Sequence, residues 1–212
     1  MEMIAIIDYG AGNIKSVQNA IGHLGFQPLL TSNPNDVLKA DKVILPGVGA
    51  AASTMASLKE LELDKAICEY VSAGKPFLGI CIGMQVLFEY AEESGGCSCL
   101  GILPGRVKKL PSGQKTPHMG WNQVSQIRPH YIFRGIKGGD YFYFVHSYYA
   151  FPDDEAMVIG RTSYGIDFCS AVARGALVAT QFHPEKSGSS GLRLYENFLR
   201  GETAEEGNRD HA

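Results

Sequence analysis

The sequence predicts an α/β fold, a three-layer sandwich in which helices cover both faces of a mostly parallel central sheet. The composition is that of an ordinary globular protein, with 212 residues of which 45% are hydrophobic and 19% charged. In the first half, short apolar runs alternate with amphipathic stretches, which is typical of βα units. Glycine is abundant, with 25 residues or about 12% against a usual ~7%, and this predicts many tight turns.

The elements of the first half are expected in strand and helix pairs. Their ranges are 3–8 with 14–24, 43–45 with 61–73, and 76–80 with 83–90. In the second half, Gly, Pro and Asn turns separate strands expected at 106–110, 140–145, 157–162, 168–173 and 177–181, and a final helix is expected at 191–200. These later strands either extend the central sheet or form a small appended one.

One domain is expected over residues 1–201. The length is about 1.4 times the ~150-residue domain prior, and no Pro- or Ser-rich linker divides the middle of the chain. Residues 202–212 are polar and offer no apolar face, so a solvated or disordered tail is expected there.

Charge, hydropathy and cysteine content disfavour several classes of protein. The net charge of 19 − 22 = −3 disfavours a general nucleic-acid binder. The uncharged stretch 43–58 is shorter than the ~20 residues of a membrane helix, so no membrane span is expected. Residues 1–8 carry two acids and no basic region, unlike a signal peptide. Five cysteines, an odd number, favour free thiols in the cytoplasm.

The segment Gly79-Ile80-Cys81-Ile82-Gly83 is the most informative in the chain. An apolar strand runs into G-x-C-x-G and then into a helix-like run, as in a nucleophile elbow. Small residues are needed on either side because the turn is sharp. At the start of a helix, Cys81 would also meet free N–H groups and the positive end of the helix dipole, which favour a thiolate. The alternative is a buried core cysteine at a glycine-rich bend.

His183 is the strongest candidate for the base that such a thiol requires. It follows the apolar strand expected at 177–181, and Glu185 lies two residues later, where an extended backbone points both side chains the same way. Both Cys81 and His183 end predicted strands, where ligands bind in open α/β sheets. The alternative is a plain turn at His183. His146, the rival base, and His118 are interpreted as structural residues, with a substrate or interface contact as the alternative.

A glycine pair after the strand at 43–45 is the candidate oxyanion site. Gly47, Val48 and Gly49 would let backbone N–H groups approach an anionic oxygen, although a simple turn is the alternative. The stretch 9–15 is only half a dinucleotide fingerprint, and no Walker A sequence exists, so no cofactor is expected. Cys97 and Cys99 lack a second ligand pair at metal spacing, so no metal site is expected either.

Taken together, the elbow at 79–85, the glycine turn at 46–49 and the ending at 182–185 resemble the class I (triad-type) glutamine amidotransferases. The resemblance covers nearly the whole chain, to about residue 201, and implies a flavodoxin-like sheet. The segments 9–13, 117–122, 144–148 and 183–188 are similar, more narrowly, to the glutaminase subunits of imidazole glycerol phosphate synthases.

The resemblance implies a role for each matching residue. Cys81 would attack the side-chain amide of glutamine, His183 would protonate the departing ammonia and then activate water, and Glu185 would orient His183. The glutamine would be surrounded by Gln85, Glu93, Ser147 and Tyr148, and a partner interface would include Asn13, Trp121, Tyr143 and Lys186.

The partner implied by the resemblance is a (β/α)₈-barrel cyclase, because this chain is too short to contain that second domain. There, ammonia would convert the phosphoribulosyl intermediate PRFAR to imidazole glycerol phosphate and AICAR in histidine biosynthesis. The backbone at 47–49 would be mispositioned until the partner holds its ligand, a two-state coupling. Ala51 departs from the aromatic residue often found there, which leaves open how the side chains pack behind this strand.

Two other functions stay open. One is a different triad amidotransferase, serving anthranilate, guanylate or pyridoxal phosphate synthesis; residues 118–122 and the pair at 147–148 distinguish it. The other is a non-catalytic partner-binding module, against which the intact Cys81, His183 and Glu185 argue.

Overall fold

Five parallel strands form one side of an eight-stranded sheet and position the other elements. In the computed structural model, which describes residues 2–201, the strand order is β2-β1-β3-β4-β14-β13-β12-β9. The pairs from β2 to β14 are parallel and those from β14 to β9 antiparallel. The bounds are β1 Ile4–Ile7, β2 Leu29–Thr31, β3 Lys42–Leu45, β4 Phe77–Ile80, β9 Ser125–Gln126, β12 Val158–Ser163, β13 Asp167–Arg174 and β14 Leu177–Thr180.

The sequence of the central strands explains their position. All four residues are buried in each of β1, β3, β4 and β14, as expected for strands covered on both faces. The order β2-β1-β3-β4-β14 is the flavodoxin-like 2-1-3-4-5 arrangement. The predicted α/β class with a mostly parallel central sheet is confirmed.

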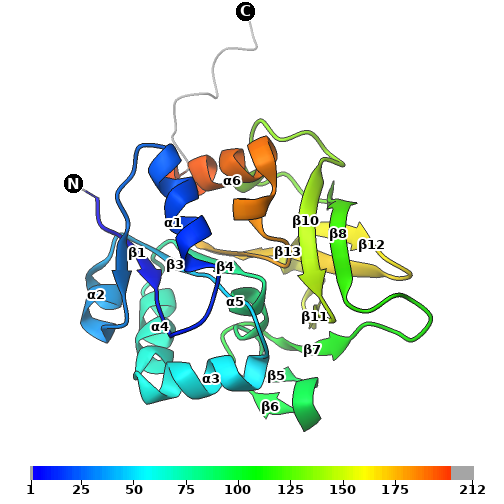
Figure 1. The fold of residues 1–212 in the computed structure, drawn as a ribbon, viewed down its shortest axis with the longest axis horizontal. Helices are drawn as coiled ribbons and strands as arrows, with labels where there is room; N and C mark the ends of the chain where they lie inside the picture. The colour runs from blue at the N-terminus through cyan, green and yellow to red at the C-terminus, as the bar shows by residue number, and fades with distance from the viewer. Residues whose placement is uncertain (1, 202–212) are drawn as a thin grey trace, which may run out of the picture.

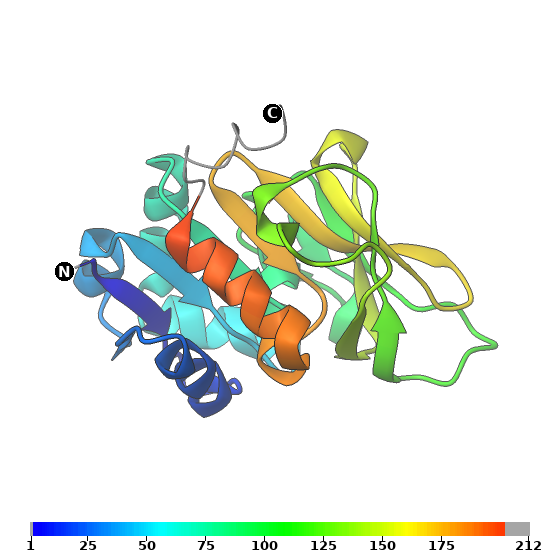
Figure 2. The ribbon, with the colours of Figure 1, turned by 90° about the horizontal axis from the view of Figure 1, so that it is seen from above.

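Helices cover the two faces of the sheet in separate layers. Helices α1 (Ile14–His23) and α6 (Gly188–Arg200) lie above the sheet in Figure 1 and side by side in Figure 2. Helices α3 (Ala51–Glu60) and α4 (Leu63–Ser72) lie below it, with α2 (Pro34–Lys39) beside α4. Two buried apolar clusters, one on each face, fill the spaces between these layers.

Two small sheets are appended at the end of the molecule that carries β12. One pairs β8 (His118–Gln123) with β10 (Tyr141–His146), side by side at the right of Figure 1. The other has the order β11-β7-β5-β6, with bounds Tyr148–Pro152, Gly105–Lys109, Tyr90–Ala91 and Cys97–Ser98. The later strands therefore both extend the central sheet and form appended ones.

The remaining helices are single turns. The short helix α5 spans Ile82–Gln85, and the 3₁₀ turns are η1 Glu93–Gly95, η2 Tyr131–Phe133, η3 Glu155–Met157 and η4 Pro184–Lys186. No helix within residues 2–201 is both long and apolar enough to cross a membrane. The tail expected at 202–212 lies outside the described residues.

The structure corrects two expectations about local elements. The helix expected at 83–90 ends at Gln85, because Leu87 and Phe88 are wholly buried and their N–H groups close tight turns onto Met84 and Gln85. No strand is expected from the sequence at 118–123, but Trp121 lies there in strand β8, opposite Tyr143 of β10. Glycine and asparagine around it imitate a turn, but the pairing partner lies some 20 residues away.

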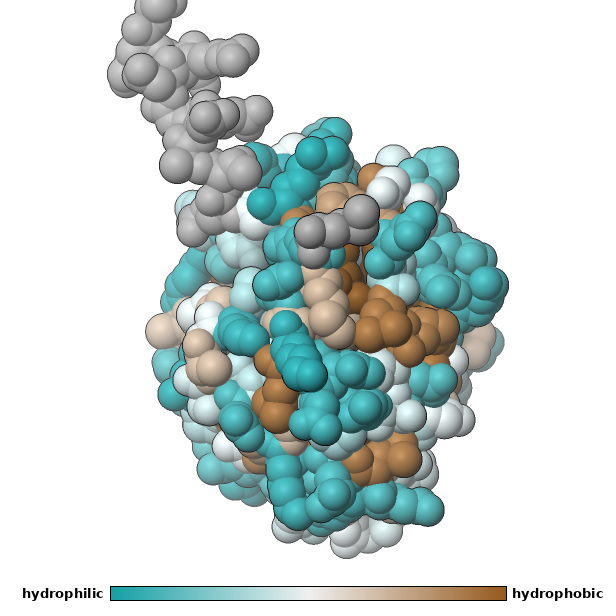
Figure 3. Space-filling view, turned by 90° about the vertical axis from the view of Figure 1, so that its left-hand side faces the viewer, coloured by the Kyte–Doolittle hydropathy of each residue, from teal (hydrophilic) through white to brown (hydrophobic). Residues whose placement is uncertain are grey.

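Two apolar side chains are exposed on β2, at the free edge of the sheet. Leu29 is 42% exposed and Leu30 37%. Figure 3, which faces this end of the molecule, shows a mostly hydrophilic surface with small separate hydrophobic patches. Met119 and Trp121, on β8, are more exposed than these leucines, at 62% and 55%.

Candidate active site

Cys81 stands at a sharp turn between β4 and α5. Its φ of 55° lies in the left-handed region that a cysteine rarely adopts, so the turn holds it in a strained conformation. A β-carbon at Gly83 would come 2.0 Å from the carbonyl oxygen of Leu45, and one at Gly79 would come 2.7 Å from that of Gly83. The backbone is therefore packed so tightly here that only glycine fits on either side of Cys81.

His183 is brought to the same edge of the sheet by strand pairing. Strands β4 and β14 are parallel neighbours, with Ile80 opposite Thr180, and the N–H of Cys81 donates to the carbonyl of Thr180 at 2.7 Å. Because parallel strands end at a common edge, Cys81 and His183 meet across 102 residues of sequence.

Glu185 accepts a hydrogen bond from His183, with Oε1 2.8 Å from Nδ1, and both side chains are about 1% exposed. The backbone between them is a 3₁₀ turn and not the extended link expected from the sequence. The carboxylate is held from two further sides, because Asn13 Nδ2 donates to Oε1 at 3.2 Å and the Tyr195 hydroxyl to Oε2 at 3.4 Å.

Cys81 and His183 open into a cavity of about 340 Å³. Its wall includes Val48, Gly49, Cys81, Gln85, Glu93, His146, Ser147, Tyr148, His183 and Lys186. The cavity is large enough for an amino-acid side chain, and polar side chains line it together with Cys81.

Charge at the site favours a proton on His183. Burial opposes the imidazolium, but the neighbouring sulfur of Cys81 and the carboxylate of Glu185 outweigh it and raise the pKa of His183 to about 10. Burial also acts against the charged form of Glu185, and its bond to His183 nevertheless lowers the pKa of that carboxyl. Within the described residues, His183 Nε2 is buried without a hydrogen-bond partner, so it is available to a reacting group. Together, Cys81, His183 and Glu185 have the groups that nucleophilic acyl chemistry requires.

His146, the rival base, lines the cavity but has both ring nitrogens engaged. Nδ1 lies 2.9 Å from the carbonyl oxygen of Tyr148, and Nε2 lies 2.9 Å from Nδ1 of His118. An imidazole with both nitrogens occupied has no free lone pair for a substrate proton.

Residues 5–201 match the family described as glutamine amidotransferase class-I. The chain belongs to the class-I glutamine amidotransferases. It is 59% identical over 198 residues to the imidazole glycerol phosphate synthase subunit HisH of Dehalococcoides mccartyi strain 195, covering 93% of this chain and 97% of that protein. It is 52% identical to the HisH subunit of Moorella thermoacetica over the same length, covering 93% and 94%. Within the family, the chain therefore groups with the HisH subunits.

Two solved structures share the amidotransferase fold at low sequence identity. One is the structure of PurLQS from Thermotoga maritima, with a TM-score of 0.74, 19% identity, and coverage of 94% of this chain and 99% of that chain. The other is a glutamine amidotransferase from Thermotoga maritima, with a TM-score of 0.63, 17% identity, and coverage of 94% and 83%. These likenesses agree with the fold described above.

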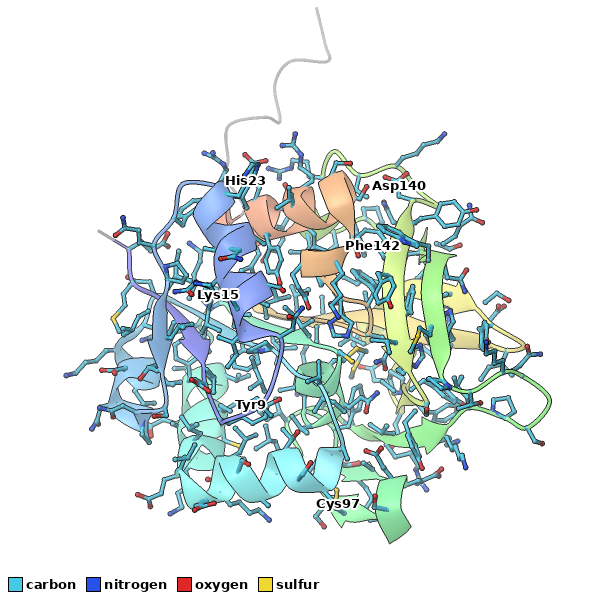
Figure 4. The ribbon with its side chains drawn as sticks, viewed as in Figure 1. Tyr9, Lys15, His23, Cys97, Asp140 and Phe142 are labelled. Carbon is cyan, nitrogen blue, oxygen red and sulfur yellow. The ribbon has the colours of Figure 1, made fainter. Side chains whose placement is uncertain are left out.

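The candidate oxyanion loop of this amidotransferase packs directly on the elbow. A β-carbon at Gly47 would come 2.8 Å from the backbone nitrogen of Gly83, and Gly49 has a φ of 101°. Val48 and Gly49 line the cavity. Tyr9 lies behind the loop, between α1 and α3 in Figure 4, and burial raises the pKa of its hydroxyl to about 12.

All four predicted glutamine contacts line the cavity: Gln85, Glu93, Ser147 and Tyr148. Gln85 Nε2 is already used within the protein, since it donates to the Tyr148 carbonyl at 2.8 Å and to Gln181 Oε1 at 3.0 Å.

The four predicted interface residues divide into two groups. Trp121 and Tyr143 make an edge-on contact with ring centroids 6.2 Å apart, and Lys186 Nζ lies 5.6 Å from the centre of the Tyr143 ring. These three form a surface cluster near the cavity. Asn13 instead turns inward to Glu185.

Sequence reasoning missed Tyr195 and Gln181 as neighbours of the site. Tyr195 comes from α6, and Gln181 directly follows β14, two residues before His183. The position of Gln181 beside the predicted base was the available signal. Cys97 lies on β6, below α3 in Figure 4, and its sulfur is 3.9 Å from that of Cys99, which directly follows the strand. No cluster of metal-ligating side chains occurs among residues 2–201.

Proposed function

We propose that this HisH-type chain hydrolyses glutamine to glutamate and ammonia with Cys81, His183 and Glu185, and delivers the ammonia to a cyclase partner in histidine biosynthesis. The observation that carries the proposal is the meeting of Cys81 and His183 in one cavity, with Glu185 bonded to the far nitrogen of the imidazole at 2.8 Å. The 59% identity to a HisH subunit supports this branch over the anthranilate, guanylate and pyridoxal phosphate alternatives.

In the first half of the reaction, the Cys81 sulfur attacks the carboxamide carbon of glutamine. Negative charge develops on the amide oxygen, where backbone N–H groups of Gly47, Val48 and Gly49 can stabilise it by about 3–4 kcal/mol per donor. As the intermediate collapses, His183 Nε2 gives its proton to the nitrogen, ammonia leaves, and a thioester remains. Because its pKa is raised to about 10, His183 holds that proton before the reaction begins.

In the second half, His183 takes a proton from water, and the hydroxide formed attacks the thioester carbon. Glutamate leaves and the proton returns to the Cys81 and His183 pair. Glu185 stays bonded to Nδ1 throughout, which fixes the ring orientation and leaves Nε2 facing the substrate. These steps consume glutamine and water and release glutamate and ammonia.

The partner we propose is a (β/α)₈-barrel cyclase that docks over Trp121, Tyr143 and Lys186. Ammonia must reach it unprotonated, so a face next to the cavity suits transfer to PRFAR, giving imidazole glycerol phosphate and AICAR. Trp121 is 55% exposed, and large exposed aromatic side chains are typical anchors of interfaces. Five free cysteines in the described residues agree with the reducing cytoplasm, which is the compartment we propose.

Glutamine turnover measured with and without partner and ligand tests this proposal. We expect weak activity in the isolated chain and a large increase when the cyclase and PRFAR are added. The Cys81→Ala variant should lose glutamine-dependent product formation while the complex still uses ammonium salts. Unchanged turnover on adding the partner, or failure of ammonium to rescue the variant, would contradict the proposal.

A further inference from the structure

A continuous chain of hydrogen bonds connects strand β8 with the sulfur of Cys81. At its outer end, Asn122 Nδ2 donates to the carbonyl of Ser163 at 2.9 Å and lies 3.2 Å from His118 Nε2. His118 Nδ1 lies 2.9 Å from His146 Nε2, and His146 Nδ1 lies 2.9 Å from the carbonyl oxygen of Tyr148. Strands β8 and β10, which carry the two histidines, lie side by side in Figure 1.

From the Tyr148 carbonyl, the same chain continues into the site. Gln85 Nε2 donates to this carbonyl at 2.8 Å and to Gln181 Oε1 at 3.0 Å. Gln181 Nε2 in turn donates to Cys81 Sγ at 3.7 Å. Gln85 and Gln181 are 2% and 0% exposed, so both amides are buried.

The backbone carbonyls of Ser163 and Tyr148 fix the direction of every hydrogen bond in the chain. The Tyr148 carbonyl can only accept, so His146 must donate from Nδ1, and its Nε2 must accept from His118 Nδ1–H. His118 Nε2 must then accept from Asn122, which agrees with the donation of Asn122 to the Ser163 carbonyl. Both imidazoles therefore have to be neutral, each with its proton on Nδ1.

The surroundings of the two histidines keep them in that form. The ring of His118 lies between Tyr164 and Phe144, with centroids 4.0 and 4.9 Å away. Burial lowers the pKa of His118 to about 4 and that of His146 to about 3, against 6.5 for a free histidine. At neutral pH the chain of bonds thus has one arrangement of protons.

We propose that Gln181 is a positioning residue for the nucleophile, whose amide N–H is held on the Cys81 sulfur by Gln85, and that His146, backed by His118, fixes the Tyr148 carbonyl to which Gln85 also donates. The proposal rests on the proposed function in that it assigns Cys81 as the nucleophile. A donor bonded to sulfur stabilises the thiolate more than the thiol and fixes the side-chain rotamer. Because Gln181 Oε1 is occupied by Gln85, the amide cannot flip and place its oxygen against the sulfur.

Alkylation of Cys81 by iodoacetamide, followed by mass spectrometry of the peptide that contains it, tests the proposal without glutamine turnover. Gln181→Met keeps the size of the side chain and removes the donor, and we expect the labelling rate of Cys81 to fall about tenfold. Cys68, half-buried on α4, is the internal reference and should label equally in every variant. A Cys81 rate in Gln181→Met within twofold of the unmodified chain would overturn the proposal.

A matched pair at His146 tests the support of the amide. His146→Asn retains a donor the same number of bonds from the backbone as Nδ1, whereas His146→Leu has none. We expect the Asn variant to label Cys81 within about twofold of the unmodified chain and the Leu variant to label it as slowly as Gln181→Met. Equal rates in the two His146 variants would overturn the role of this donor, whatever their thermal stability.

Steady-state kinetics in the complex with the cyclase separate this proposal from the proposed function. Gln181→Met should lower kcat about tenfold with KM for glutamine nearly unchanged, because Gln181 contacts the sulfur and does not line the cavity. An unmodified complex without glutaminase activity would reject the function while the labelling result stood. A fully active complex whose Gln181→Met form labels normally would reject only the positioning role.

Discussion

Glu93 accepts a hydrogen bond from the backbone N–H of Ala51, with Oε2 2.8 Å from the nitrogen. Ala51 is the first residue of α3, follows the 47–49 loop, and is wholly buried, so a small residue fills the space behind that loop. Ala50 provides no side-chain cap for the helix. The carboxylate of Glu93, in the distant 3₁₀ turn η1, caps the helix instead. The same side chain also forms part of the cavity wall.

Replacement of Glu93 by alanine should therefore have two separate effects. We expect the free energy of unfolding to fall by about 1 kcal/mol, as for the loss of a helix cap. We also expect KM for glutamine to rise, because the cavity loses a negative charge that can face the substrate ammonium group. Urea unfolding and initial-rate kinetics check the two effects. Glu93→Gln, which keeps the acceptor, should recover the stability and not the KM.

Glu185→Gln should lower kcat on the order of 10³-fold while leaving the fold intact. The amide oxygen can still accept from His183 Nδ1, but the charge that raises the pKa of His183 is gone. The measurement is glutamine turnover in the complex with the partner. Glu60→Gln, an exposed carboxylate on α3, is the matched control, and a similar kcat for both variants would contradict the role of Glu185.

Gly83→Ala should destabilise the protein by about 3 kcal/mol or more, since the new methyl group would meet the Leu45 carbonyl oxygen at 2.0 Å and backbone cannot move aside cheaply. Gly22→Ala, within α1 and with nothing inside 4 Å of the new carbon, should stabilise it by roughly 0.5–1 kcal/mol. Chemical denaturation of the two variants checks the contrast. Equal stabilities would mean that the elbow is looser than the structure indicates.

The buried histidine pair should make the fold sensitive to acid. Folding holds the pKa values of His118 and His146 at about 4 and 3, below the 6.5 of the unfolded chain, so the unfolded state binds more protons once the pH falls below 6.5. The stabilisation is complete above that pH and is lost as the pH falls toward 4 and then 3. Between pH 6.5 and 5, we expect a loss on the order of 2 kcal/mol per imidazole.

Unfolding free energies measured across this pH range check the expectation. His146→Asn should remove about half of the acid-dependent loss, because asparagine does not titrate. The exposed His23, replaced by asparagine in the same way, should leave the slope unchanged. A His146→Asn slope equal to that of the unmodified chain would contradict the assignment.

Trp121→Ala should weaken binding of the cyclase by about 2 kcal/mol, roughly 30-fold in Kd, with little change in stability. The indole is 55% exposed and contacts Tyr143 by its edge, so its removal leaves no internal cavity. Calorimetric titration of the two subunits gives the Kd. Leu29→Ala, exposed on β2 at the far edge of the sheet, is the control, and it should bind normally.

The parts of the fold that rest on local pattern were predictable. Continuous apolar runs marked β1, β3 and β4, and their alternation with amphipathic stretches indicated the parallel sheet. Strand β8 was not, because its six residues gain their stability from pairing with β10, and glycine and asparagine within it resemble a turn. Helix α3 was also missed, since its cap comes from Glu93 and not from a neighbour in sequence.

The candidate site likewise has residues that the sequence predicts and residues that it does not. The elbow around Cys81 and the pair of His183 and Glu185 are encoded in short segments, and the common edge of parallel strands brings them together. The contacts of Asn13, Tyr195 and Gln181 depend on how helices α1 and α6 and strand β14 pack, which no local spacing reveals.

Strand β4 lies between β3 and β14, and its second neighbour follows it by about 100 residues in the sequence. During translation, β3 is available at once, but the other side of Phe77–Ile80 stays unpaired until Leu177–Thr180 has left the ribosome. While the roughly 100 residues between these strands are made, the nascent chain thus carries a bare apolar strand edge, the kind of surface that recruits chaperones or aggregates. The enzyme cannot become active before this last strand is inserted, because the same insertion delivers the imidazole to the thiol.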